Sequence, residues 1–205
     1  MNCHGKTGVR STTPALLLFV FSHLASGADI KGKVIVDGSR TPENIAVYVD
    51  SIPGQSFPAP KQHMILDQAH LTFIPHVLVF QKGTTVDFKN DDPVNHNIYW
   101  QNVGGNRGLA HNMGIFPPGN SQPFTFNDLG AIPLLCNVHP RMSGFILVVP
   151  TPYFAVTDKQ GNFVIKHVPA GRHALKTWSS DLQLATQSVT VAGTADVRLI
   201  IHLQN

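Results

Sequence analysis

Hydrophobic positions along the chain come in short runs, and no window shows a long helical period. In 85–88 and 145–149 apolar side chains alternate with others or form β-branched blocks, and turn-forming pairs such as Lys82 and Gly83 separate the runs. This pattern predicts an all-β protein. The predicted strands are 33–36, 45–49, 71–74, 77–80, 85–88, 97–100, 124–126, 134–135, 145–149, 154–156, 162–165, 173–177, 187–191 and 197–203.

Two stretches predict irregular structure. Residues 51–60, SIPGQSFPAP, are too rich in proline and glycine for a regular element and are interpreted as a linker. Residues 102–120 are rich in glycine and asparagine and predict a long loop.

The carboxyl-terminal strands are too few to form a stable hydrophobic core by themselves. Residues 151–205 make a small core for a segment without cysteine. The strands predicted within 29–51 have no evident place in the middle of the chain. We therefore expect a discontinuous β-sandwich from 29–51 and 151–205, with a second domain at 52–150 inserted at an exposed turn.

The amino terminus has the features of a secretory signal peptide. Lys6 and Arg10 precede the short apolar run ALLLFVF, and the small residues Ser26, Gly27 and Ala28 follow. The run is shorter than the roughly 20 residues that span a bilayer. We expect cleavage after residue 28, export to the periplasm or beyond, and no membrane span in the mature chain.

Charge argues against one class of partner. The chain has 15 basic and 12 acidic residues, and removal of Lys6 and Arg10 with the leader leaves 13 − 12 = +1. The mature chain therefore lacks the basic excess of a nucleic-acid binder.

Cysteine usage points to a metal. Cys3 lies in the predicted leader, so Cys136 is the only cysteine of the mature chain. A lone cysteine in an exported protein is an intermolecular disulfide partner, a reactive thiol or a metal ligand. His139 and Met142 follow it at intervals of three residues, which favours metal ligation.

The available donor atoms select copper. Cys136, His139 and Met142 supply a thiolate, an imidazole and a thioether, and His96 in FKNDDPVNHNIYW can add a second imidazole. Two histidines, a cysteine and a weak axial methionine form a blue-copper electron-transfer site. Asn97 directly after His96 can hydrogen-bond across to the other ligand loop, an outer contact that orients ligands.

With these motifs, 61–149 resembles the cupredoxins. The matching features are GTTVDFKN at 83–90, the pair His96 and Asn97, and the loop CNVHPRM, whose spacing is most similar to that of amicyanin. The resemblance implies a Greek-key β-sandwich. It also implies that His96, Cys136 and His139 are equatorial copper ligands and that Met142 is the axial one.

The flanking segments resemble a carboxypeptidase regulatory-like β-sandwich, in IKGKVIVDG and in FAVTDKQGNFVIKHVPAGRHALKTW. The whole is similar to exported bacterial proteins described as plastocyanin-like or as methylamine-utilisation proteins. Arg141 departs from the cupredoxin pattern, which commonly has an apolar or aromatic residue between the second histidine and the methionine.

The function expected from these features is that of a monomeric carrier of single electrons, with one copper ion cycling between Cu(I) and Cu(II) and a redox partner protein. Four protein ligands leave no open position for a substrate, so we do not expect an enzyme. Alternatives are a copper chaperone or tolerance protein, and a partner-binding module with an accessory copper site. His111 and Met113 either form an extra copper site or pack over the first.

Overall fold

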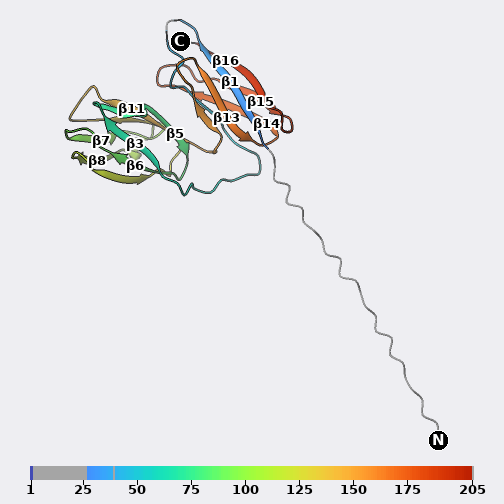
Figure 1. Cartoon of the computed structure of the whole chain (residues 1–205), viewed down its shortest axis with the longest axis horizontal. Coiled ribbons are helices and arrows are strands. Elements are labelled where there is room, and N and C mark those ends of the chain that lie inside the picture. Colours follow the sequence, from blue (N-terminus) through green and yellow to red (C-terminus); the bar gives the residue numbers. More distant parts are fainter. Residues whose placement is uncertain (2–26, 39, 205) are drawn as a thin grey trace.

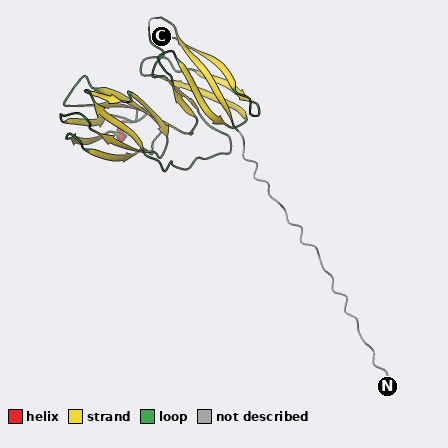
Figure 2. Cartoon of the chain, viewed as in Figure 1, coloured by secondary structure: helices red, strands yellow, loops and turns green. Residues whose placement is uncertain are grey.

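The computed structural model describes Met1, residues 27–38 and residues 40–204. The described chain is built of β-strands, with one short 3-10 turn at Arg107–Leu109 (Figure 1, Figure 2). Most of the predicted signal peptide, 1–28, lies outside the described residues. Within the described part of the chain, no helix is long and apolar enough to cross a membrane.

One β-sandwich is formed by strands between residues 64 and 149. Its two sheets have the orders β5-β11-β10-β7-β8 and β4-β3-β6-β9. The first sheet contains β5 (Val77–Gln81), β11 (Ser143–Val149), β10 (Gly130–Leu135), β7 (His96–Trp100) and β8 (His111–Phe116). The second contains β4 (Thr72–Ile74), β3 (Met64–Ala69), β6 (Thr85–Lys89) and β9 (Ser121–Thr125). Neighbouring strands are often distant in sequence, and the pairs β5–β11 and β3–β6 are parallel.

The core of this sandwich follows from strand alternation. In β6, Val86 and Phe88 are buried, while Thr85, Asp87 and Lys89, which alternate with them, are partly exposed. Successive side chains of a strand point to opposite faces of the sheet, so these two enter the space between the sheets. There they join one buried cluster that includes Trp100, Cys136 and Met142.

A second β-sandwich combines both ends of the described chain. Its sheets have the orders β13-β1-β16 and β12-β2-β14-β15. The strands are β1 (Ala28–Val36), β2 (Ala46–Val49), β12 (Phe154–Val156), β13 (Asn162–Val168), β14 (Gly171–Trp178), β15 (Thr186–Val191) and β16 (Val197–Leu203). β1 lies between β13 and β16, and β2 lies between β12 and β14, so each amino-terminal strand completes a sheet. Ala28, the last residue of the predicted leader, is buried in β1 opposite Val168.

The two sandwiches share an apolar interface. Strand β5 is buried along its whole length, with Leu78 and Phe80 in the first core and Val77 and Val79 facing the second sandwich. β11 behaves in the same way, because Leu147 and Val149 also join this outer cluster. Burial on both faces explains why β5 is a continuous apolar run rather than an alternating one.

The fold prediction, all-β with two β-sandwiches, is confirmed, and 51–60 contains no helix or strand. Two strands of the structure, β8 and β3, are absent from the predicted set, and β9 and β10 begin earlier than predicted, whereas Leu71 precedes β4. β8 lies inside the loop predicted at 102–120, because an edge strand that pairs only with β7 tolerates asparagine and glycine. β3 was not predicted, because Ile65 is exposed and Gln68 is buried, which inverts the expected alternation.

Candidate metal centre

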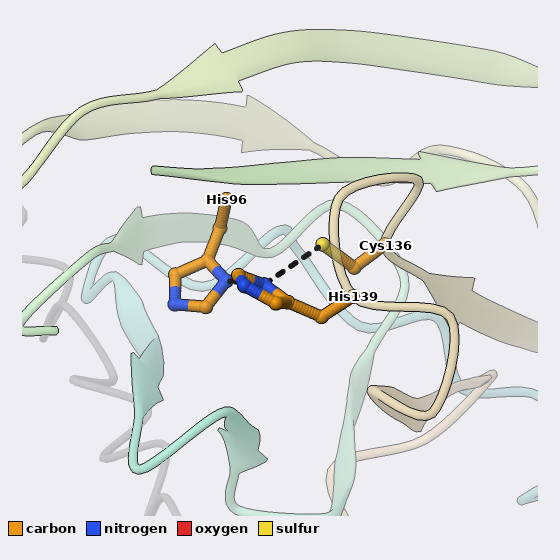
Figure 3. Close-up of side chains that lie close together, drawn as sticks. All are labelled: His96, Cys136 and His139. Atoms are coloured by element: carbon orange, nitrogen blue, oxygen red, sulfur yellow. Dashed lines mark hydrogen bonds between the residues drawn. The ribbon is translucent and has the colours of Figure 1, made fainter. Parts of the chain in front are cut away.

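The predicted ligands meet at one end of the first sandwich. His96 is the first residue of β7, and Cys136 directly follows β10. His139 and Met142 lie in the short connection between β10 and β11. Figure 3 shows the side chains of His96, Cys136 and His139 pointing toward one another. The pairing of β10 with β7 through Leu135 and Tyr99 brings the two segments together.

The distances suit a shared metal ion. The ligand atoms of His96, Cys136 and His139 all lie within 4.8 Å of one another. The two Nδ1 atoms of the histidines are 3.0 Å apart, and the Cys136 Sγ atom is 4.0 Å from His139 Nδ1. Protein nitrogen and sulfur ligands typically lie about 2.0–2.3 Å from an ion such as zinc, so a single ion fits between donors this close. Among the described residues, this is the one group of three or more His, Cys, Asp or Glu side chains with such spacing.

The chemistry of the donors agrees with the geometry. Cys136 is a free cysteine and is only 3% exposed, while His96 is 0% exposed. A thiol and two imidazoles are soft and intermediate ligands, and they favour copper or zinc over magnesium or calcium. These residues therefore fit the metal that the sequence predicts.

Met142 is placed in the same core. It is buried and belongs to the hydrophobic cluster that contains Cys136. Its backbone N–H donates to the carbonyl oxygen of His139 at 2.8 Å, which closes the ligand loop as a tight turn. This turn keeps the thioether residue next to the two other ligands of the loop.

Asn97 links the two ligand segments. Its backbone N–H donates to Cys136 Sγ at 3.4 Å, and its side-chain oxygen accepts from the N–H of Asn137 at 3.4 Å. Its amide nitrogen donates to Asn112 and to the carbonyl oxygen of Gly114. The hydrogen bond across to the other loop, expected from sequence, is therefore present.

The sequence analysis did not single out Asp92. One carboxylate oxygen of Asp92 lies 2.8 Å from Nε2 of His96. Burial would raise the pKa of the Asp92 carboxyl, but the hydrogen bonds donated by Leu71, His96 and His70 outweigh it and lower the pKa below its usual range. The available signal was a carboxylate four residues before the histidine, across a bend that contains Pro93.

The surroundings of the two histidines differ. His96 is fully buried, whereas His139 is partly exposed. Three apolar side chains on the adjoining loops are exposed: Leu71 at 50%, and Val94 and Val138 at 41% each. Arg141, also exposed, lies between His139 and Met142 in the loop.

The two residues of the suggested extra site, His111 and Met113, lie on β8. His111 packs against the rings of Trp100 and Phe124, at centroid distances of 5.1 and 4.9 Å. Met113 is partly buried against the core of the sandwich. His111 does not belong to the three-residue group described above, and metal binding by His111 and Met113 stays a prediction.

Comparison with known families gives one partial match. Residues 151–199, within the second sandwich, match the family described as polysaccharide lyase family 4, domain II. This description differs from the carboxypeptidase regulatory-like sandwich that the sequence resembles, so that resemblance stays a prediction. A search of curated proteins gave no match.

Comparison with solved structures gives matches over about half of the chain. A purple cupredoxin from Nitrosopumilus maritimus is 26% identical, with 42% of this chain and 98% of that chain covered and a TM-score of 0.37. A reduced mutant of amicyanin is 21% identical, with 44% and 85% covered and a TM-score of 0.39. An amicyanin mutant in its Cu(I) form is 22% identical, with 48% and 96% covered and a TM-score of 0.39.

Proposed function

We propose that this chain is an exported type 1 copper protein that carries single electrons between redox partners and is not an enzyme. The observation that carries the proposal is the convergence of His96, Cys136 and His139, whose ligand atoms lie within 4.8 Å of one another. Copper bound there would supply a one-electron couple between Cu(I) and Cu(II). The resemblance of the CNVHPRM loop to amicyanin supports the same role.

Burial favours a resident ion over a transported one. His96 and Cys136 are buried, and Asn97 ties the two loops that carry them together. A protein that hands copper to another molecule needs ligands that its partner can reach. A carrier instead benefits from ligands held in one arrangement, because rearrangement slows electron exchange.

The partner is proposed to dock where His139 reaches the surface. Three exposed apolar side chains lie near the ligands in the chain or through one contact. Val138 directly precedes His139 and Val94 lies two residues before His96. The backbone of Leu71 donates to Asp92, which itself contacts His96. A small apolar surface suits a weak, short-lived encounter. Arg141 adds a positive charge beside His139 and favours a partner with acidic groups near its own redox centre.

Export rests on the predicted leader and on the single cysteine of the mature chain. The periplasm would expose a free thiol to oxidation, and coordination at a buried site protects Cys136 from it. With Met142 as a fourth ligand, no position stays open for a substrate, which argues against an enzyme.

Titration of the full mature chain with Cu(II) tests the proposal. We expect one equivalent to produce an intense visible band from thiolate-to-Cu(II) charge transfer and a single EPR-active species. His111→Ala is the matched control, because it removes a histidine outside the cluster and should leave band and stoichiometry unchanged. A fully oxidised, copper-loaded protein without colour would rule the proposal out.

A further inference from the structure

One buried carboxylate joins two segments of the first sandwich. Asp92 is 8% exposed, and its carboxylate has three hydrogen-bond partners. Its Oδ1 atom accepts from the backbone N–H of His70 at 2.7 Å, and its Oδ2 atom accepts from the backbone N–H of Leu71 at 2.9 Å. The same Oδ2 atom lies 2.8 Å from Nε2 of His96. A turn at the sandwich surface and a buried ligand are therefore held by a single side chain.

The turn that Asp92 holds has an unfavourable backbone conformation. Ala69 pairs with Thr72, so His70 and Leu71 form the two-residue connection between β3 and β4. Both have positive φ values, 56° and 57°. Such turns are normally built from asparagine and glycine, and a branched residue such as leucine is a clear outlier.

Packing does not compensate for this conformation. The side chains of His70 and Leu71 are both exposed, so neither gains burial in return. Strained residues persist where the surroundings over-determine them. Here the surroundings are the two hydrogen bonds that the consecutive N–H groups of His70 and Leu71 donate to the carboxylate of Asp92.

Asp92 is itself held in place from its own loop. Asn90 is fully buried, and its side-chain oxygen accepts from the N–H of Asp92 at 3.0 Å. Its amide nitrogen donates to the carbonyl oxygens of Val94 and Phe116 at 2.9 and 2.7 Å. The N–H of Asp92 also donates to the carbonyl oxygen of Gln68 at the end of β3. The carboxylate therefore has little freedom to follow a moving imidazole.

The contact between the Asp92 carboxylate and Nε2 of His96 decides which nitrogen of His96 is available to a metal. An ionised carboxylate only accepts hydrogen bonds, so Nε2 of His96 must carry the proton. In the neutral ring Nδ1 is then left with a lone pair, and this atom lies 3.0 Å from His139 Nδ1 in the ligand cluster. Among the described residues, His139 has no comparable carboxylate partner.

We propose that Asp92 is a positioning residue that holds the His96 ring and the strained His70–Leu71 turn as one rigid unit. It selects the tautomer that presents Nδ1 to the metal and fixes the ring plane before an ion binds. The test below has three measurements. The rate of copper release rests on the proposed function, whereas the tautomer of His96 and the hydrogen exchange of the His70–Leu71 turn do not.

The first readout is the His96 tautomer in the full mature chain without added metal, observed by long-range ¹⁵N–¹H NMR. In the wild type we expect a single Nε2–H form. In Asp92→Ala we expect a mixture with Nδ1–H, together with amide hydrogen exchange at His70 and Leu71 at least about tenfold faster. Loss of such outer contacts typically costs about 10–100-fold in metal affinity or activity, so Cu(II) release to a chelator should quicken in that range.

Two control variants separate positioning from general effects. Asp91→Asn makes a charge change one residue away and should leave the tautomer unchanged. Leu71→Gly keeps the N–H while glycine adopts positive φ without strain, so it should also leave tautomer and copper release unchanged. If Leu71→Gly shifts the tautomer as Asp92→Ala does, the proposal is overturned.

A conservative variant covers the case in which Asp92→Ala does not fold. Asp92→Asn has one acceptor oxygen and cannot satisfy His70, Leu71 and His96 together. At least one of two readouts must then change: the tautomer of His96, or the rate of amide hydrogen exchange at His70 and Leu71. A folded variant in which neither changes would refute the positioning role. If the wild type binds no copper but shows the single Nε2–H tautomer, the proposed function is refuted and the positioning role of Asp92 stands.

Discussion

At the scale of single residues, Cys136 is the candidate ligand on which the proposed copper chemistry most depends. Its sulfur is buried, has no disulfide partner among the described residues and accepts a hydrogen bond from the N–H of Asn97 at 3.4 Å. Hydrogen bonds to a ligating sulfur and the dryness of its surroundings tune a copper site's potential. The same burial shields the thiol from oxidants.

Substitution Cys136→Ser tests this role. We expect complete loss of the visible charge-transfer band, because a hydroxyl does not replace a soft thiolate. The Asn97 N–H can still donate to the hydroxyl, so the unfolding free energy measured without added metal should fall by no more than about 1–3 kcal/mol. The checks are an absorption spectrum with one equivalent of Cu(II) and urea denaturation. Retention of the intense band would show that another group provides it.

At the scale of elements, tight turns tied by a carboxylate recur in the chain. In the turn between β12 and β13, Asp158 accepts from the N–H groups of Asn162 and Gln160 at 2.8 and 2.9 Å. It also accepts from the side-chain amide of Asn162 at 3.1 Å. The hydrogen bond from the Asn162 backbone, followed by that from its side chain, lowers the pKa of Asp158. None of these hydrogen bonds joins Asp158 to a candidate metal ligand, whereas Asp92 holds a turn and also contacts His96.

The stability contributed by Asp158 should depend on pH. Because its pKa is lower in the folded state, the contribution is present above the unfolded value, about 3.9, and is lost as pH falls through the folded value. Asp158→Asn should therefore be less stable than the wild type at pH 7, and the difference should shrink toward pH 2. Urea denaturation at both pH values measures it. A difference that does not change with pH would contradict the assignment.

At the scale of the whole molecule, the two sandwiches are joined through the outer faces of β5 and β11. Val77, Val79, Leu147 and Val149 pack there with Ala46 of the second sandwich. Ile146, one residue before Leu147, faces the opposite core, which contains Cys136 and Met142. The sheet therefore separates the interface from the core that contains the candidate metal ligands.

Alanine substitutions at these two neighbours should separate the roles of the two faces. Leu147→Ala should lower the unfolding free energy by about 2–5 kcal/mol, the usual range for a buried leucine, and leave the visible spectrum of the copper form unchanged. Ile146→Ala should cost a similar amount and also shift the spectrum, because it loosens the core around the ligands. Calorimetry and absorption spectra measure both effects. Equal spectral shifts in the two variants would refute this separation.

The sequence by itself determined the β character, most strands and the residues of the candidate metal cluster. Those features are local: alternation is visible within five residues, and Cys136, His139 and Met142 share one short loop. His96 was found because its residue type completes the donor set. The edge strand β8 and strand β3, in which Ile65 is exposed and Gln68 is buried, were not predicted. Their local composition does not show which of their side chains are buried.

Only the tertiary structure decided the role of Asp92. Its partners His70 and Leu71 lie more than twenty residues earlier and reach it because β3 runs parallel beside β6. No local pattern encodes that pairing, and the strained turn has neither asparagine nor glycine to mark it. The interface of β5 and β11 was likewise hidden, because an apolar run shows that a strand is buried but not what covers each face.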